Sequence, residues 1–303
     1  MTKVFIDGEA GTTGLRIRDR LADRGDITLI RLEEDRRKDD GARAEAYGQA
    51  DVAILCLPDD AAIQAAAMAG PTRLIDASTA HRVKEGWVYG MPELPGARNA
   101  IRDAVRVANV GCYATGSIAM LRPLTDAGIV PATAPVTLTG VSGYSGGGKS
   151  LIAEFEAGTA PACFLYALGQ SHKHLAEIVE YGGLTRTPAF QPMVGNFRQG
   201  MAVQLHLHAD MLGGGVPGAQ RLEAALREFY AGDPFVRVAM AQDRVDPQRL
   251  NGTNRMELSV HGNGYDRITV VAVLDNLGKG ASGTAIQNLN LMIGADETEG
   301  LIA

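Results

Sequence analysis

The chain has 303 residues, of which 46% are hydrophobic and 21% charged, so it is expected to be globular and to form about two domains. The 29 basic and 35 acidic residues leave a net charge of −6, which gives no broad electrostatic reason to bind nucleic acid or an anionic membrane. No apolar run approaches the roughly 18 residues that span a bilayer, so no membrane segment is expected.

Strands and helices are predicted to alternate over the first third of the chain. The expected strands are the short apolar runs at 3–7, 27–32, 51–57, 73–76 and 105–110, with helices expected at 15–24 and 59–69. Such alternation is typical of right-handed crossovers. Residues 1–112 are therefore predicted to form an α/β domain with a doubly wound parallel sheet of the Rossmann type.

A glycine-rich turn lies between the first expected strand and the first expected helix. Gly8, Gly11 and Gly14 have the spacing GxxGxxG, and Thr12 and Thr13 stand before the last glycine. Glycines at such a turn permit a tight bend and let the backbone approach a pyrophosphate at the helix N-terminus. We therefore expect these residues to bind a dinucleotide, the alternative being a strand–helix turn without a ligand.

The charged residues after the second expected strand bear on the choice of dinucleotide. Glu33 or Glu34 would suit the 2′-hydroxyl of NAD, whereas Arg36, Arg37 and Lys38 would suit the 2′-phosphate of NADP. A solvated charged loop is the third possibility. The residues alone leave this choice open.

Beyond Cys112 the pattern changes to strands with few helices between them. A helix is expected at 113–127, with a kink or break at Pro123, and helical spacing returns at 276–293. The expected strands are 136–141, 199–211, 235–240, 256–261 and 268–274. Residues 113–280 are therefore predicted to form a second, α+β domain with a mixed or antiparallel sheet.

The three cysteines form neither a CxxC metal motif nor a disulfide framework, so we expect no metal and a reducing cytoplasm. Cys56 lies in an apolar run and Cys163 has no basic neighbour, so both are expected to be packing residues. Cys112 stands where a strand ends and a helix begins, where backbone N–H groups and the helix dipole favour the thiolate. Cys112 is therefore the expected nucleophile, a buried structural cysteine being the alternative.

A thiol nucleophile needs an acid–base partner. His172 and His174 are the best candidates, because they stand at an expected helix start with Glu177 three residues beyond His174. The other histidines are expected in a surface loop (His81), on one strand face as packing or interface residues (His206 and His208) and near a strand end (His261). Arg82, Lys149 and Arg198 are candidate anchors for a phosphate or carboxylate.

Seven segments stand in the order found in one known family: residues 8–14, 89–94, 109–116, 141–149, 172–174, 197–201 and 275–281. On these segments essentially the whole chain resembles the short form of N-acetyl-γ-glutamyl-phosphate reductase, in the aspartate-semialdehyde dehydrogenase group. Ala176 departs from the family, in which many members have proline, and is expected to change a turn and not the chemistry.

The resemblance implies a step of arginine biosynthesis. N-acetyl-L-glutamyl 5-phosphate, an acyl phosphate, would be reduced by NADPH to the 5-semialdehyde through a thioester on Cys112, with His172 or His174 as acid and base. The resemblance favours NADP over NAD through Arg37 and Lys38. Related alternatives are the reductases of aspartyl and carrier-linked aminoadipyl phosphates, and a nucleotide-binding sensor is the alternative without catalysis.

The resemblance also bears on the C-terminal part of the chain. It places Asn276 and Gly278 at the cofactor, with Gly280 and Gly283 also letting the backbone approach it. It implies that a helix within residues 281–303 completes the first domain. It further implies a homo-oligomer, a dimer or tetramer, built through the sheet of the second domain.

Overall fold

The computed structural model describes residues 1–213, 218–263 and 266–303 and divides into two compact units. Unit 1 consists of Met1–Gly111 with Ala281–Ile302, and unit 2 consists of Cys112–Gly280 with Ala303. Within the described residues, no helix combines the length and the apolar character needed to cross a membrane.

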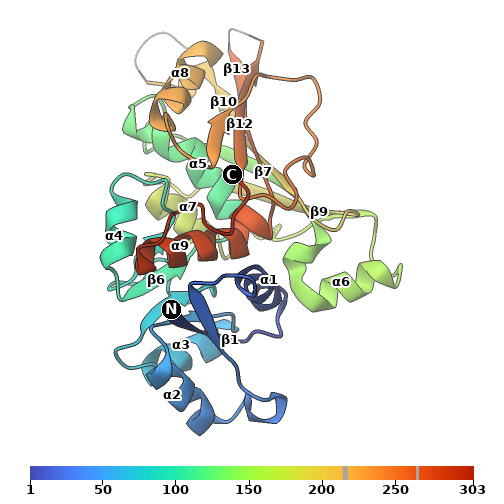
Figure 1. The fold of residues 1–303 in the computed structure, drawn as a ribbon. Coiled ribbons are helices and arrows are strands. Elements are labelled where there is room, and N and C mark those ends of the chain that lie inside the picture. Colours follow the sequence, from blue (N-terminus) through green and yellow to red (C-terminus); the bar gives the residue numbers. More distant parts are fainter. Residues whose placement is uncertain (214–217, 264–265) are drawn as a thin grey trace. The chain divides into compact units, whose positions relative to one another are not determined.

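Unit 1 contains a six-stranded parallel sheet with the order β2-β1-β3-β4-β6-β5 (Figure 1). Its strands are β1 (Thr2–Asp7), β2 (Ile27–Ile30), β3 (Val52–Leu55), β4 (Arg73–Asp76), β5 (Val88–Gly90) and β6 (Arg106–Asn109). The sheet is the one that the sequence predicts, except that β5 is absent from the prediction. This edge strand has only three residues, too few to show a period.

Helices cover both faces of this sheet, so it is doubly wound as predicted. They are α1 (Thr12–Leu21), α2 (Asp40–Gln49), α3 (Asp59–Met68), α4 (Ala97–Asp103) and α9 (Gly283–Ile293). Val4 packs in one apolar cluster with Ile17 of α1 and Leu289 of α9, whereas Phe5 packs in another with Tyr47 of α2. Successive residues of a strand point to opposite faces, so these two clusters are the two sides of the sheet.

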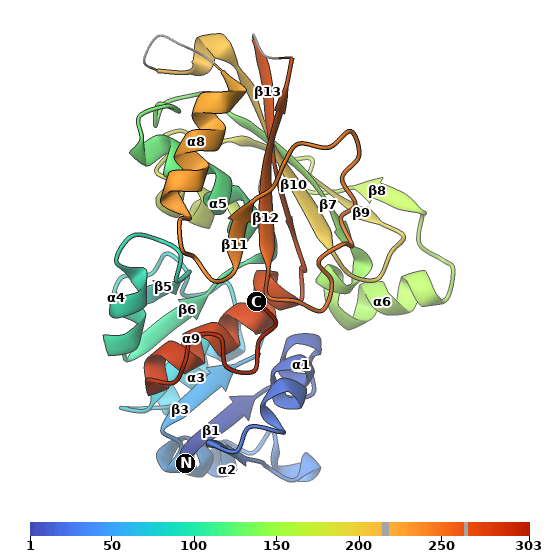
Figure 2. The same ribbon diagram turned by 45° about the horizontal axis from the view of Figure 1, so that its top comes forward.

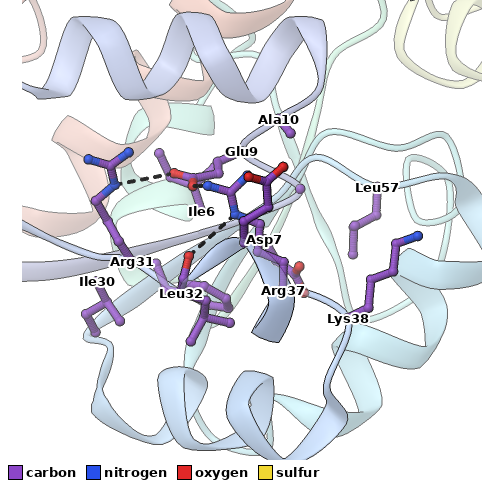
Figure 3. A pocket seen from close by; sticks show the side chains of 13 residues that line it. Ile6, Asp7, Glu9, Ala10, Ile30, Arg31, Leu32, Arg37, Lys38 and Leu57 are labelled. Atoms are coloured by element: carbon purple, nitrogen blue, oxygen red, sulfur yellow. Dashed lines mark hydrogen bonds and ion pairs between the residues drawn. The ribbon is translucent and has the colours of Figure 1, made fainter.

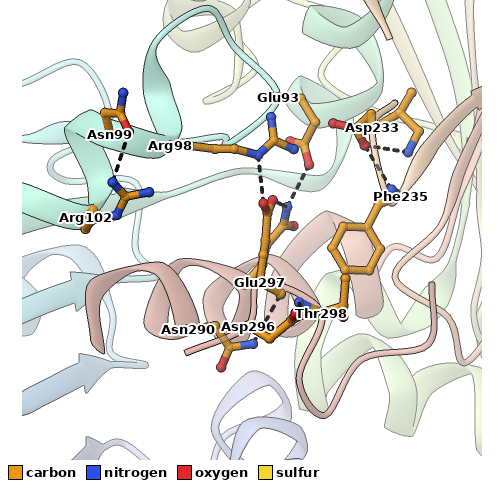
Figure 4. Close-up of polar contacts among 12 residues, drawn as sticks. Glu93, Arg98, Asn99, Arg102, Asp233, Phe235, Asn290, Asp296, Glu297 and Thr298 are labelled. Atoms are coloured by element: carbon orange, nitrogen blue, oxygen red, sulfur yellow. Dashed lines mark hydrogen bonds and ion pairs between the residues drawn. The ribbon is translucent and has the colours of Figure 1, made fainter. Parts of the chain in front are cut away.

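Polar contacts tie the C-terminal segment into unit 1 (Figure 4). Gln287 of α9 is fully buried and donates to Oε1 of Glu93 at 2.9 Å and to Oε1 of Glu297 at 2.7 Å. Oε2 of Glu297 pairs with Nε of Arg98 in α4 at 2.7 Å. Residues from both ends of the chain therefore build the same unit.

Unit 2 contains a seven-stranded mixed sheet with the order β11-β12-β13-β10-β7-β9-β8 (Figure 2). Its strands are β7 (Thr137–Gly143), β8 (Cys163–Leu165), β9 (Ala189–Gly195), β10 (Met201–His208), β11 (Val236–Val238), β12 (Met256–Gly262) and β13 (Arg267–Leu274). The pairs β7–β9 and β11–β12 are parallel and the others antiparallel, which confirms the predicted mixed sheet. Strands β8 and β9 are absent from the prediction: β8 has only three residues, and Pro192 within β9 argues against a strand.

The helices described in unit 2 are α5 (Cys112–Asp126), α6 (Gly148–Glu156), α7 (Leu175–Tyr181) and α8 (Ala219–Phe229). Helices α5 and α8 lie on one side of β10, β12 and β13 (Figure 2). Of the kink or break expected at Pro123, the break is wrong because α5 continues to Asp126. Proline cannot donate to the carbonyl of Ala119, four residues earlier, but the hydroxyl of Tyr230 donates to that oxygen at 2.9 Å.

Candidate functional site

The glycine turn follows β1 directly, and two of its glycines leave no room for a side chain. Gly8 has a φ of +87°, and a Cβ on it would lie 2.4 Å from the carbonyl oxygen of Cys56, just after β3. A Cβ on Gly14 would lie 2.5 Å from the carbonyl oxygen of Gly8. The strand order reverses between β1 and β3, and ligands of open α/β sheets bind at such a point.

Gly8→Ala is expected to lower the free energy of unfolding by about 2 kcal/mol or more, because it adds both backbone strain and a clash with a carbonyl group. Thermal or urea unfolding measures this change. Gly48→Ala is the matched control. Gly48 lies in α2, and its added Cβ would meet no described atom within 4 Å, so the variant should gain up to about 1 kcal/mol. Equal stability of the two variants would contradict the packing argument.

A pocket opens beside this turn (Figure 3). Its lining residues are Phe5, Ile6, Asp7, Gly8, Glu9, Ala10, Ile30, Arg31, Leu32, Glu34, Arg37, Lys38 and Leu57. Of the residues proposed for the ribose, Arg37, Lys38 and Glu34 line it, whereas Glu33 and Arg36 do not. Arg31 is an additional cation that the sequence analysis missed, because the second strand was expected to reach residue 32 but ends at Ile30.

The charges in this pocket are paired through Glu9. Nη2 of Arg37 lies 2.7 Å from Oε1 of Glu9, and Nε of Arg31 lies 3.8 Å from Oε2 of Glu9. Nε of Arg37 also donates to the carbonyl of Leu32 at 3.4 Å. Across the described ranges of the chain, Lys38 has no ion-pair partner. The pocket thus presents cations near the end of β2, where a 2′-phosphate would bind.

A buried carboxylate fixes the position of α2 against the end of β1. Oδ2 of Asp7 accepts a hydrogen bond from the hydroxyl of Tyr47 at 2.5 Å and another from Nη2 of Arg43 at 2.8 Å. Burial and the adjacent Asp7 raise the pKa of Tyr47, so its hydroxyl remains a donor. These contacts hold the strand end from which the glycine turn starts.

Cys112 in unit 2 is the first residue of the 15-residue helix α5. It lies against the segment after β13, because a Cβ on Gly280 would be 2.7 Å from Cβ of Cys112. The other cysteines differ from it. Burial and the nearby Asp76 and Asp7 raise the pKa of Cys56 to about 12, so that group remains a thiol. Cys163 is exposed, so the expectation that it packs is wrong; it lies on the edge strand β8.

Two tyrosines lie in the electrostatic neighbourhood of Cys112. Burial, followed by the nearby Tyr166 and Cys112, raises the pKa of Tyr113 well above its ordinary value. Burial and Cys112 likewise raise the pKa of Tyr166. Tyr113 is anchored by hydrogen bonds from its hydroxyl to the carbonyls of Met193 at 2.7 Å and Gly140 at 3.3 Å. Both phenols therefore remain protonated near Cys112.

The same aromatic group brings His172 and His174 together. The ring centroids of the two histidines are 4.7 Å apart, and the ring of His172 meets that of Tyr113 edge to face at 5.9 Å. Nδ1 of His172 accepts the backbone N–H of His174 at 3.1 Å, while its Nε2 lies 3.3 Å from the hydroxyl of Tyr166. His172 is therefore held through both ring nitrogens. His174 is 4% exposed and directly precedes α7, in which Glu177 is buried.

Three loops of unit 2 meet around the segment that contacts Cys112. Oδ1 of Asn276 accepts the N–H of Gly200 at 2.8 Å, and its Nδ2 donates to Oγ of Ser145 at 3.1 Å. Asp275 is fully buried and accepts from the backbone N–H of Gly252 at 2.9 Å and from Gln199. These residues lock the backbone that leads to Gly280.

The glycines of this segment are required by packing inside unit 2. A Cβ on Gly278 would lie 2.4 Å from the carbonyl oxygen of Thr253, and Gly280 contacts Cys112 as described. The resemblance explained these glycines by the approach of a cofactor. The structure supplies a separate reason for them, and the cofactor role of Asn276 and Gly278 stays a prediction.

His81 is buried, so its expected place in a surface loop is wrong. It is 2% exposed, its Nδ1 lies 2.6 Å from Oδ2 of the fully buried Asp76, and its ring stacks on Trp87 at 4.0 Å. Ser78 donates to the same carboxylate at 2.7 Å. Asp76 is the last residue of β4, and its carboxylate binds Ser78 and His81 of the following loop. These contacts keep His81 buried, which the sequence of the loop does not indicate.

The three candidate anchors have different surroundings. Arg82 is 7% exposed, and its Nε donates to the carbonyl of Asn109 at 3.0 Å. Lys149 and Arg198 are exposed, and Arg198 pairs with Glu156 of α6 at 3.2 Å. The backbone carbonyl of Arg198 accepts the N–H of Ser145 at 3.0 Å. Within unit 2, Arg198 is therefore adjacent to the loop that precedes Lys149.

The remaining histidines lie on the mixed sheet. His206 and His208 are exposed on one face of β10, where Nε2 of His206 lies 2.8 Å from Oγ1 of Thr139. Burial lowers the pKa of His206, and burial together with Arg249 lowers that of His261. Among the described residues, no three His, Cys, Asp or Glu side chains gather so as to hold a metal ion.

Comparisons with known proteins relate the whole chain to one enzyme group. A family model described as semialdehyde dehydrogenase, dimerisation domain, matches residues 112–276. An N-acetyl-gamma-glutamyl-phosphate reductase of Chelativorans sp. (strain BNC1) is 50% identical over 305 residues, covering 96% of this chain and 98% of the relative. Aspartate semialdehyde dehydrogenase II of Vibrio cholerae shares the fold, with a TM-score of 0.72 at 18% identity over 97% of this chain and 98% of that one. The Candida albicans aspartate semialdehyde dehydrogenase solved with NADP has a TM-score of 0.70 at 15% identity, over 97% and 99% of the two chains.

Proposed function

Because this chain belongs to the N-acetyl-γ-glutamyl-phosphate reductase family, we propose that it reduces N-acetyl-L-glutamyl 5-phosphate to N-acetyl-L-glutamate 5-semialdehyde in arginine biosynthesis, with release of phosphate. It is thus an oxidoreductase. The observation that carries the mechanism is the position of Cys112 at the start of α5, near two protonated tyrosines that contact His172. The cysteine supplies a nucleophile and the histidines supply proton transfer.

The first step is acyl transfer to the thiol. The thiolate of Cys112 attacks the acyl carbon, a C–S bond forms, the C–O bond to phosphate breaks, and phosphate leaves with the electron pair. The N-terminus of α5 stabilises the thiolate through its dipole. The first backbone N–H groups of this helix are also placed to stabilise the tetrahedral oxyanion. The product of this step is a thioester on Cys112.

Reduction of the thioester needs a hydride and a proton donor. NADPH, when bound, supplies the hydride to the thioester carbonyl carbon. His174 gives a proton to the tetrahedral oxygen and takes it back as the C=O bond re-forms and the C–S bond to Cys112 breaks. The aldehyde then leaves and the thiolate is restored.

His174 is assigned this role because His172 is already committed to other contacts. An Nδ1 that accepts the backbone N–H of His174 carries no proton in neutral His172, so its proton is on Nε2, toward Tyr166. His172 is therefore a positioning residue for the segment that carries His174. The buried Glu177, one turn beyond His174, is proposed to fix the orientation of that ring.

The glycine turn and the adjacent pocket of unit 1 fit NADPH. Gly8, Gly11, Thr12, Thr13 and Gly14 are proposed to form the cradle for the pyrophosphate, because they lead into the N-terminus of α1, which begins at Thr12. Arg37 and Lys38 in the pocket are the groups for the 2′-phosphate. Asn276 and Gly278 are proposed to complete the cofactor site.

Arg37→Ala combined with Lys38→Ala is expected to weaken binding of NADPH by tenfold or more and that of NADH by less than about threefold. Each charge-assisted bond to the 2′-phosphate contributes about 1.5–3 kcal/mol, and NADH, which has no 2′-phosphate, makes none of these bonds. Titration of cofactor fluorescence measures both dissociation constants. Equal weakening of both cofactors, or tighter binding of NADH by the unaltered protein, would assign the ribose to Glu34 instead.

The remaining proposals concern substrate, assembly and compartment. Arg82, Lys149 and Arg198 are proposed to anchor the phosphate and carboxylate groups of this small acyl phosphate, and no role in binding nucleic acid is proposed. The matched dimerisation domain supports a homo-oligomer, a dimer or tetramer, formed through the sheet of unit 2. The cytoplasm is the proposed compartment, since its reducing conditions keep Cys112 a thiol.

The test of this function is the reverse reaction. NADP⁺ reduction is followed at 340 nm with N-acetylglutamate semialdehyde and phosphate. Aspartate semialdehyde with phosphate, under the same conditions, is the comparison substrate. Rapid phosphate-dependent reduction with the acetylated substrate alone supports the proposal. Faster turnover of aspartate semialdehyde would instead assign to the chain the activity of the aspartate semialdehyde dehydrogenases, whose fold it shares.

A further inference from the structure

We propose that Glu9 sets how strongly this protein prefers NADPH over NADH, by competing with the 2′-phosphate for the guanidinium of Arg37. The inference rests on the proposed use of NADPH. Its basis is the position of a carboxylate from the glycine turn among the cations that would bind the phosphate (Figure 3).

Glu9 is one of two buried carboxylates in the pocket lining, the other being Asp7. The side chain of Glu9 is 10% exposed and makes an ion pair of 2.7 Å with Arg37, which is itself 34% exposed. A second, looser pair of 3.8 Å reaches Arg31, which is 59% exposed. Glu34 lines the same pocket but is exposed. Asp7 is engaged by Arg43 and Tyr47. Solvent screens the exposed Glu34, so Glu9 is the carboxylate expected to interact strongly with Arg37.

The two cofactors differ at one group in this pocket. A 2′-phosphate brings nearly two negative charges to the arginines, so it must share the Arg37 guanidinium with Glu9 and is repelled by the Glu9 carboxylate. The 2′-hydroxyl of NADH carries no charge and can donate to a carboxylate, as in other dinucleotide sites. Glu9 therefore disfavours NADPH without disfavouring NADH.

Without a bound cofactor, the carboxylate of Glu9 stabilises the two pocket arginines. Arg31 and Arg37 repel one another, and Glu9 neutralises part of their charge while holding Arg37 toward the pocket. The carbonyl of Leu32 also accepts from Nε of Arg37, so this guanidinium keeps one anchor when Glu9 is neutralised. Removal of the Glu9 charge is therefore expected to free Arg37 for the phosphate without displacing it.

Isothermal titration calorimetry tests this with 2′,5′-ADP, NADPH and NADH as ligands. Glu9→Gln is expected to tighten binding of 2′,5′-ADP and NADPH by about three- to tenfold, as for loss of one partly screened charge, and to leave NADH unchanged or weaker. Glu34→Gln, the matched control, should change every dissociation constant by less than about twofold. The same order should appear in the thermal shift that each ligand produces.

A double-mutant cycle locates the effect on Arg37. In the Arg37→Ala background, Glu9→Gln should tighten 2′,5′-ADP by less than about twofold. Equal tightening of NADH and NADPH, or weaker binding of NADPH by Glu9→Gln, would overturn the proposal in favour of a general charge effect or a purely positioning role. Absence of NADPH binding by the unaltered protein would instead overturn the proposed cofactor, whichever substrate the turnover assay identifies.

Discussion

Cys112→Ala is expected to lower kcat by at least about 10³-fold, because loss of a covalent nucleophile leaves only residual catalysis by binding and orientation. The variant should retain its fold and its binding of NADPH, since the change removes only the sulfur atom of a partly buried side chain and the glycine turn belongs to the other unit. Steady-state NADPH oxidation measures turnover, and calorimetry with NADPH provides the control for folding. Turnover near that of the unaltered protein would exclude the thioester.

Phosphate release without cofactor isolates the acyl-transfer step. Mixed with N-acetylglutamyl phosphate alone, the protein should release about one phosphate per active site in a rapid burst, because the thioester then waits for a hydride. Cys112→Ala should show no burst. A burst in that variant would place the acyl group on another residue.

Cys163→Ala is the matched control, because it removes a thiol that has no proposed role in the reaction. Cys163 is exposed on β8, so its replacement should leave the burst and kcat within about twofold. Cys56→Ala should also keep most of the activity, because burial and two carboxylates keep its thiol protonated. Loss of the burst in either of these variants would contradict the assignment to Cys112.

The alternation of apolar runs was enough to predict the parallel sheet of unit 1, since buried strands such as Val52–Leu55 are continuous apolar segments. The pattern of apolar residues did not indicate the strands Val88–Gly90 and Ala189–Gly195. The first is too short, and the second contains a proline whose missing N–H is unfavourable in most strands. Long-range pairing, which local sequence does not encode, holds both in place.

The candidate site was predictable where chemistry follows from local position. Cys112 starts a helix after a strand, and that is visible in the sequence. Glu9 and Arg31 were missed because their proximity depends on the pairing of β1 with β2, which brings the ends of the two strands together. Tyr166 was missed for a similar reason, since only the fold of unit 2 brings its hydroxyl to His172.

The surface-loop interpretation of His81 failed for a related reason. The residues from Ser78 to Ala80 are small and two of them are polar, as in exposed loops, but Asp76 accepts hydrogen bonds from both Ser78 and His81 and holds the loop against the protein interior. A buried carboxylate needs such partners, because burying an unpaired charge is costly. The requirement becomes visible only when Asp76 is known to be fully buried.

His174→Ala is expected to lower kcat by about 10²–10⁴-fold, the usual effect of losing a general acid and base. His172→Gln should cost less than about tenfold, because its amide N–H can replace the Nε2–H of His172 that faces the hydroxyl of Tyr166. Proton donation to the tetrahedral oxygen requires protonated His174, so the rate of reduction should fall as pH rises through the pKa of that group.

The pH profile at saturating substrate separates the two roles. The basic limb should persist in His172→Gln and disappear in His174→Ala, whose residual rate no longer depends on that proton. Loss of the limb in His172→Gln alone would exchange the two assignments. Unchanged rates and profiles in both variants would remove the pair from the reaction, because a residue that moves the proton cannot be replaced without altering either quantity.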